Sequence, residues 1–189
     1  MKTDQMRSRV TRLCFSILLL QLGLLFSQAA LAASAAEINI GADATLERFK
    51  KEVSGGAQFL NKAEGVLVFP SIIKAGMVVG GEYGEGVLRI KGRNTGYYST
   101  AGASVGFQLG AQSKSVVVVF LTRQALEKFL RSDGWKVGVD GSVAVIKWGV
   151  GEDINSTEIK DPVVGFIFSN KGLMYNLTLE GSKISRIQR

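Results

Sequence analysis

The spacing of apolar residues changes near Gly65, and this change constrains the fold more than any other feature of the chain. Before it, apolar residues between Ala42 and Leu60 recur at helical spacing, about every 3.6 residues. After it, short apolar runs recur between glycines, and residues 103–111 alternate strictly between apolar and small or polar side chains. One helix followed by many short strands predicts an α+β fold.

Ten segments after Gly65 fit strands. In chain order they are Val66–Phe69, Met77–Tyr83, Gly86–Lys91, Ala103–Ala111, Val116–Phe120, Trp135–Val139, Val143–Val150, Val163–Phe168, Leu173–Leu179 and Lys183–Ile187. We expect Pro70 to end the first strand and Gly84-Glu85 to form a hairpin turn, with glycines of Gly80–Gly86 at positive φ. The predicted fold is a mainly antiparallel, strongly curved β-sheet, barrel-like or sandwich-like, with an N-terminal amphipathic helix and one short helix near residues 122–131, for which Thr122 is the N-cap candidate.

The predicted N-terminal helix, Ala42–Leu60 with a loosening at Ser54-Gly55-Gly56, either packs on its own domain or lies on a membrane surface. Between Asp43 and Glu64 it carries four basic and four acidic residues. Helices that bind lipid surfaces have a basic excess on their polar face. The balanced charge therefore favours packing on the domain.

The first 32 residues have the order of a secretory signal peptide: a basic start, an apolar run from Leu13 to Phe26, and small residues after it. The apolar run is shorter than the roughly 20 residues that span a bilayer. We expect cleavage after Ala32 or Ala35, which leaves a single domain over residues 37–189 and an exported protein, periplasmic or secreted. This segment holds four basic residues and one acidic residue, so its removal lowers the formal net charge from +7 to +4.

Composition excludes several kinds of enzyme. The chain has no histidine and one cysteine, Cys14, which leaves with the signal. There is therefore no Ser-His-Asp or Cys-His arrangement, no histidine-ligated metal and no internal disulfide. We expect neither a metal nor a cofactor.

Three local motifs suggest sites, and each has a simpler explanation. Gly80–Gly86 lacks the spacing of a nucleotide-binding loop. The repeat Gly102-x-x-x-Gly106-x-x-x-Gly110 fits one face of a strand that another segment approaches closely. Ser71-x-x-Lys74 matches the serine–lysine motif of penicillin-recognising enzymes but lacks their other two motifs, so a serine hydrolase is a remote alternative.

In order and spacing, several segments together resemble the SYLF domain family. They are Val66–Gly76, Val79–Gly86, Gly102–Gln112, Ser132–Trp135, Lys171–Met174 and Leu179–Ile184, and the resemblance covers about Leu46 to Ile187. The signature positions are Pro70, Lys74, Gly76, Gly80, Gly81, Gly84, Gly86, Gly102, Gly106, Gly110 and Gly172. The resemblance implies a mainly β fold with N-terminal helices and a lipid-binding role. Eukaryotic members bind phosphoinositide membranes and are associated with actin, whereas this chain is similar to the exported bacterial branch.

We therefore predict a non-enzymatic cell-envelope protein that binds anionic lipid or sits peripherally at the membrane surface. The alternative is a structural or interaction module that binds another envelope protein. Nucleic acid is not expected, because basic and aromatic residues are not interleaved, and actin is not expected for an exported protein. The candidate lipid contacts are Lys50, Lys51, Lys62, Lys74, Arg89, Lys91 and Arg93. A second basic cluster is Lys171, Lys183, Arg186 and Arg189. For this cluster, and equally for Arg89, Lys91 and Arg93, contact with anionic headgroups is one interpretation, and solvated surface is the favoured one.

Overall fold

One curled sheet of eight strands organises the described part of the chain, which in this computed structural model comprises residues 33–76, 79–105, 112–147, 160–169, 179 and 181–189. Its helices are α2 (Ala35–Glu52), α3 (Gly56–Lys62) and α4 (Arg123–Arg131). Its strands are β1 (Gly65–Gly76), β2 (Val79–Ile90), β3 (Arg93–Val105), β4 (Gln112–Phe120), β5 (Trp135–Lys136), β6 (Ala144–Lys147), β7 (Val163–Ser169) and β8 (Lys183–Ile187). The predicted α+β class is confirmed.

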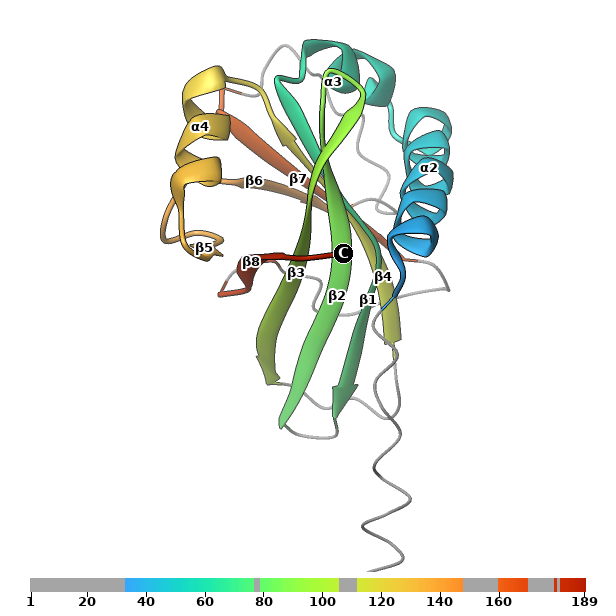
Figure 1. The fold of residues 1–189 in the computed structure, drawn as a ribbon, viewed down its shortest axis with the longest axis vertical. Helices are drawn as coiled ribbons and strands as arrows, with labels where there is room; N and C mark the ends of the chain where they lie inside the picture. The colour runs from blue at the N-terminus through green and yellow to red at the C-terminus, as the bar shows by residue number, and fades with distance from the viewer. Residues whose placement is uncertain (1–32, 77–78, 106–111, 148–159, 170–178, 180) are drawn as a thin grey trace, which may run out of the picture. The chain divides into compact units, whose positions relative to one another are not determined.

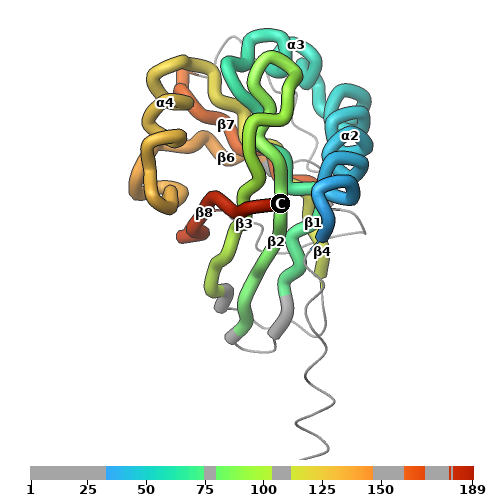
Figure 2. Tube along the Cα trace, in the orientation of Figure 1, coloured from blue at the N-terminus to red at the C-terminus, as the bar shows by residue number. Residues whose placement is uncertain are grey.

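The strand order is β5-β8-β3-β2-β1-β4-β7-β6. Neighbours are antiparallel except for β6 and β7, which run parallel. The C-terminal strand β8 returns beside β3 (Figure 2), where Tyr97 pairs with Ile187 and Ala101 with Lys183. The sheet curls so that both of its edges approach the side on which α4 lies, whereas α2 lies on the other side (Figure 1).

Each face of the sheet has its own hydrophobic core, because alternate side chains of a strand point to opposite faces. The inner face of the curl gathers Leu67, Leu88 and Val118 with Phe129 of α4 and Trp135 of β5. The outer face packs Val66, Val87, Val117 and Phe166 against the two N-terminal helices. Strand β4 lies between the two cores, and Val116 to Phe120 are all buried, as their continuous apolar run predicts.

Helix α2 begins earlier than its hydrophobic periodicity predicts. The predicted start at Ala42 is wrong, because Ser34 forms a capping box with Glu37 and the helix starts at Ala35. Phe49 is fully buried, with its ring centroid 4.7 Å from that of Phe166. The prediction that this helix packs on its own domain is confirmed, and its predicted loosening is a break before α3.

The strand end predicted at Pro70 and the turn predicted at Gly84-Glu85 do not form. Strand β1 runs through Pro70, with a register shift between Val68 and Ser71 in its pairing with β2. Proline is tolerated there because a bulge needs one amide fewer in the ladder. Strand β2 likewise runs through Gly84-Glu85, and the chain turns instead at Lys91-Gly92, both at positive φ. The glycines of β2 therefore serve close packing and not a turn.

The packing over β2 is tight at two signature glycines. A methyl group on Gly86 would overlap the carbonyl oxygen of Val68 and lie 2.6 Å from the Phe69 ring. A methyl group on Gly84 would lie 2.7 Å from Ile72 Cγ1. Side chains of β1 thus occupy the space that these glycines leave. At Gly81, by contrast, the nearest atom to a methyl group would be 3.9 Å away.

Other sequence predictions have mixed outcomes. Helix α4 forms with Thr122 as its N-cap, and the hydroxyl of Thr122 accepts a hydrogen bond from the Ala125 amide. Strands β7 and β8 match their predicted positions closely, and β5 is shorter than predicted. Strand β6 begins at Ala144, one residue later than predicted, and the last residues of its predicted range lie outside the described part of the chain. The strand predicted over Ala103–Ala111 lies partly, and that over Leu173–Leu179 almost wholly, outside the described residues, as do the signature positions Gly106, Gly110 and Gly172.

We predict that Gly86→Ala lowers the free energy of unfolding by about 1–3 kcal/mol, because overpacking forces side chains or backbone to move. The matched control is Gly81→Ala in the same strand, which should change it by less than about 0.5 kcal/mol. Urea unfolding followed by circular dichroism measures both. Equal stability of the two variants would contradict the role assigned to Gly86.

Candidate functional site

Four exposed cations gather at one end of the sheet. Helix α3 ends at Lys62, shortly before β1 begins at Gly65. Because Val66 pairs with Arg89, the turn that carries Lys91 and Arg93 lies beside the start of β1. Figure 1 shows this turn beside α3, at the end of the sheet where α2 also ends. We call the set Lys51, Lys62, Lys91 and Arg93 the cationic edge.

The residues of the cationic edge differ from their basic neighbours in having no ion-pair partner among the described residues. Lys50 Nζ lies 2.8 Å from a carboxylate oxygen of Glu47, and Arg89 Nη1 lies 2.6 Å from one of Asp43. Lys50 and Arg89 are therefore largely neutralised. The sequence predicted all of these residues as lipid contacts, but only the fold separates the paired cations from the others.

Lys74, the seventh predicted contact, lies elsewhere. It is on β1 opposite Glu82 of β2 and Gln112 of β4, toward the other end of the sheet. Only 7% of its surface is exposed. Its burial separates it from the cationic edge.

The predicted Ser71–Lys74 pair does not form the arrangement of a serine hydrolase. Both residues are on a strand, where positions three apart point to opposite faces. Ser71 is exposed and its hydroxyl lies 2.9 Å from that of Ser113, whereas Lys74 is buried. A lysine must lie within hydrogen-bond reach of the serine to activate it, and here it is on the other face of the sheet.

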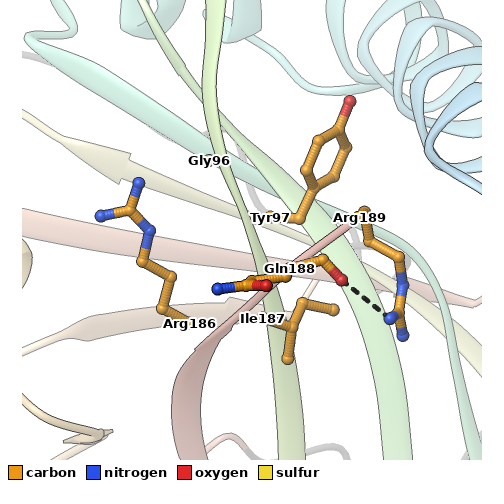
Figure 3. A pocket seen from close by; sticks show the side chains of 6 residues that line it. All are labelled: Gly96, Tyr97, Arg186, Ile187, Gln188 and Arg189. Atoms are coloured by element: carbon orange, nitrogen blue, oxygen red, sulfur yellow. Dashed lines mark hydrogen bonds between the residues drawn. The ribbon is translucent and has the colours of Figure 1, made fainter.

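A pocket of about 680 Å³ opens where β8 ends beside β3. It is lined by Gly96, Tyr97, Arg186, Ile187, Gln188 and Arg189 (Figure 3). The two arginine side chains extend to opposite sides of the strand, so they do not converge on one ligand (Figure 3). The pocket forms because β3 and β8, about ninety positions apart in the chain, pair with each other. The sequence therefore predicted a basic cluster in this region but not a pocket.

Arg189 ties the end of β8 to the outer face. Its guanidinium donates hydrogen bonds to Glu85, and the Tyr83 hydroxyl donates to the same carboxylate at 2.7 Å. Burial acts to raise the pKa of Glu85, but the hydrogen bonds from Arg189 and Tyr83 outweigh it and hold the pKa below its ordinary value. Burial, with the hydrogen bond to Glu85, raises the pKa of Tyr83.

Buried polar residues also lie on the inner face. Lys114 Nζ donates to Glu82 at 2.8 Å, and the Ser182 hydroxyl donates to the other carboxylate oxygen at 2.9 Å. Sequence reasoning missed Lys114 and Glu82 as a pair, since they are on strands separated by β1.

In the part of the chain described here, no three acidic or cysteine side chains come together to hold a metal ion. None of the described helices has the length and apolar character that crossing a bilayer requires.

We predict that the ion pair of Glu85 and Arg189 makes stability depend on acid pH. The pKa of Glu85 is lower in the folded protein than its ordinary value of 4.5. The ionised carboxylate therefore stabilises the folded state fully above pH 4.5, and this stabilisation is lost as the pH falls toward the pKa of Glu85 in the folded protein. Glu85→Gln should cost about 1–3 kcal/mol at pH 7, and the difference from the wild type should shrink below pH 4.5.

Urea unfolding at several pH values measures this dependence. Glu127→Gln, at an exposed position on α4, is the control and should stay within about 0.5 kcal/mol of the wild type. A cost of Glu85→Gln that is constant across the acid range would contradict the prediction.

Comparisons with known proteins agree with the fold and its signature. Residues 101–189 match the family described as "Ysc84: Las17-binding protein actin regulator". The proteins named "SH3 domain-containing YSC84-like protein 1" of Rattus norvegicus, Mus musculus and Bos taurus are each 28% identical to this chain over 132 residues. These alignments cover 67% of this chain and 38% of each relative, so the chain corresponds to well under half of their length. The predicted SYLF relationship is thus confirmed by the match of residues 101–189 to the Ysc84, or SYLF, domain family.

Proposed function

We propose that this protein is a non-enzymatic SYLF-type domain of the cell envelope that binds anionic lipid through its cationic edge. The family is known for lipid binding and actin regulation. The observation that carries the proposal is the grouping of Lys51, Lys62, Lys91 and Arg93, exposed and without ion pairs among the described residues, at one end of the sheet. Each basic residue close to an anionic membrane contributes about 1 kcal/mol of attraction.

The binding mode follows from the packing of α2. Its apolar residues, including Phe49 and Val53, are buried against the sheet. They cannot enter a membrane unless the helix leaves its domain, which would expose the outer core to water. We therefore propose electrostatic adsorption at the headgroup level, without insertion of the helix.

Export of the protein is the second part of the proposal. A basic, apolar and small-residue order over residues 1–32 supports a cleaved signal peptide. Cleavage after Ala32 keeps Ser34, whose side chain caps α2, whereas cleavage after Ala35 removes it. The capping box thus favours the first site. An exported chain does not meet actin, so we do not extend the family's link with actin to it.

The first experiment is co-sedimentation of the purified protein with vesicles of phosphatidylcholine, with and without phosphatidylglycerol. We expect binding only with the anionic lipid, weakening as salt rises because ions screen exposed charges. A variant in which all four residues of the cationic edge are changed to glutamine should bind the anionic vesicles at least tenfold more weakly. A loss of about 1.4 kcal/mol of binding free energy is enough for a tenfold change in affinity.

A second fourfold variant controls for net charge. Lys128→Gln, Lys136→Gln, Lys183→Gln and Arg186→Gln remove the same charge from exposed positions outside the cationic edge. This variant should retain most of the binding. Equal losses in the two variants would refute a localised contact, and absence of wild-type binding would favour the alternative of a protein-interaction module.

The export proposal is tested by expressing the full chain in a Gram-negative host and measuring, by mass spectrometry, the molecular mass of the protein recovered from the periplasm. The mass should correspond to a chain that begins at Ala33. A mass that includes residues 1–32, or recovery only in the cytoplasm, would contradict it.

A further inference from the structure

The carboxylate of Glu85 on the outer face accepts hydrogen bonds from three separate parts of the chain. The Tyr83 hydroxyl, on the same strand, donates to Oε1 at 2.7 Å, and Arg189, beyond the end of β8, donates to both oxygens. The backbone amide of Ala33, just before α2, donates to the same carboxylate. The Glu85 side chain is only 6% exposed. Its four donors match the roughly four lone-pair positions that a carboxylate offers.

Ala33 is held in place by contacts on its C-terminal side. The amide of Ser34 donates to the Glu37 carboxylate at 2.7 Å, and the amide of Glu37 donates to the Ser34 hydroxyl at 3.2 Å. This capping box fixes the start of α2. The Ala33 side chain packs against the outer core. None of these contacts involves a residue before Ala33, so they persist when the chain is cut in front of it.

Ala33 is also the first residue after the cleavage site that the capping box favours. Hydrolysis of the peptide bond between Ala32 and Ala33 consumes one water molecule. It leaves a carboxylate on the departing peptide and an amine on Ala33. An α-amine has an ordinary pKa of about 8, so it takes up a proton at neutral pH. The nitrogen that donates to Glu85 as an amide therefore becomes an ammonium with three N–H donors.

The charges around this nitrogen favour the ammonium. Two carboxylates, of Glu85 and Glu37, stand against one guanidinium, that of Arg189. The residues opposite Glu85 in the sheet, Ser71 of β1 and Ser99 of β3, are uncharged. A cation at the start of a helix opposes the helix dipole, so an ammonium is stable there only beside a carboxylate. The new positive charge balances the two negative ones together with Arg189.

We propose that Glu85 is the binding site for the α-ammonium that removal of the signal peptide creates at Ala33. The inference rests on the proposed export and not on lipid binding by the cationic edge. Hydrogen bonds between two charged groups are stronger than those from a neutral amide. Processing thus strengthens an existing contact, and Glu85 then joins the segment before α2 to the segment after β8 through two ion pairs.

The first test titrates the α-amine of the protein recovered from the periplasm, after its mass has identified the first residue. Nitrogen NMR of alanine-labelled protein follows this amine in the folded state and in urea. A neighbouring carboxylate raises the pKa of an amine. We expect the folded amine to titrate at least about 0.5 pH unit above the unfolded one. Glu85→Gln should lose most of this difference, and Glu127→Gln, the exposed control, should keep it.

The second test displaces the ammonium without a substitution at Glu85. A Gly-Ser insertion after Ala32 moves the new amine two residues away and leaves Ala33 with its amide. We expect this variant to melt at a lower temperature than the wild type at pH 7. The folded pKa of the amine is raised, so its stabilisation is present below about pH 8 and is lost as the pH rises through the folded value. The difference in melting temperature should therefore vanish in alkaline solution.

The same insertion made in Glu85→Gln should change the melting temperature little, whereas a merely structural effect of the insertion would persist there. Equal amine titration in the folded and unfolded protein would overturn the inference. A larger loss in Glu37→Gln than in Glu85→Gln would assign the ammonium to the capping box and overturn it as well.

Other outcomes separate this inference from the proposed function. A periplasmic protein that begins at Ala36 would overturn the Glu85 site and leave export standing, whereas absence of export would overturn both. The fourfold variant of the cationic edge should keep the raised pKa of the amine. Lipid binding and the Glu85 site therefore fail independently.

Discussion

The close packing of β1 side chains over β2 is the contact on which the inner half of the structure depends. Phe69 and Ile72 occupy the volume that Gly86 and Gly84 leave free, and both belong to the inner core. A larger residue at either glycine would push β1 side chains out of the space in which Phe129 of α4 also packs. Dense interiors transmit such strain because they contain few voids. At Gly84 and Gly86, glycine is therefore required for the packing of β1 on β2.

The outer half depends on a different contact. Phe49 and Phe59 bring the two N-terminal helices onto Phe166 of β7, and Arg89 and Tyr97 bind Asp43 and Asn39 of α2 at its polar border. These contacts fix α2 to the sheet and bury its apolar stripe. A helix held in this way presents its charged face to the surroundings and keeps its apolar face on the sheet.

Three physical situations are represented among the cations of the described residues. Some are neutralised by neighbouring carboxylates, as in Lys50 with Glu47. Some are exposed at the cationic edge, where water and dissolved salt screen their charge. Lys74 is largely buried and lies opposite Glu82 in the register of β1 and β2. The same residue type is thus exposed to water at one end of the sheet and largely buried toward the other.

Local pattern alone determined a good part of this protein. The strict run Val116–Phe120 predicted a strand buried on both faces, and Thr122 predicted the start of α4, because burial and capping are properties of short segments. The sequence misplaced the turn at Gly84-Glu85, since a glycine that permits a turn is indistinguishable from one that permits close packing until its neighbours are known. It also treated seven basic residues as equivalent contacts. Only tertiary structure paired Arg89 with Asp43, exposed Lys62 and buried most of Lys74, because strand register and curl set which side chains meet a carboxylate, water or the interior of the sheet.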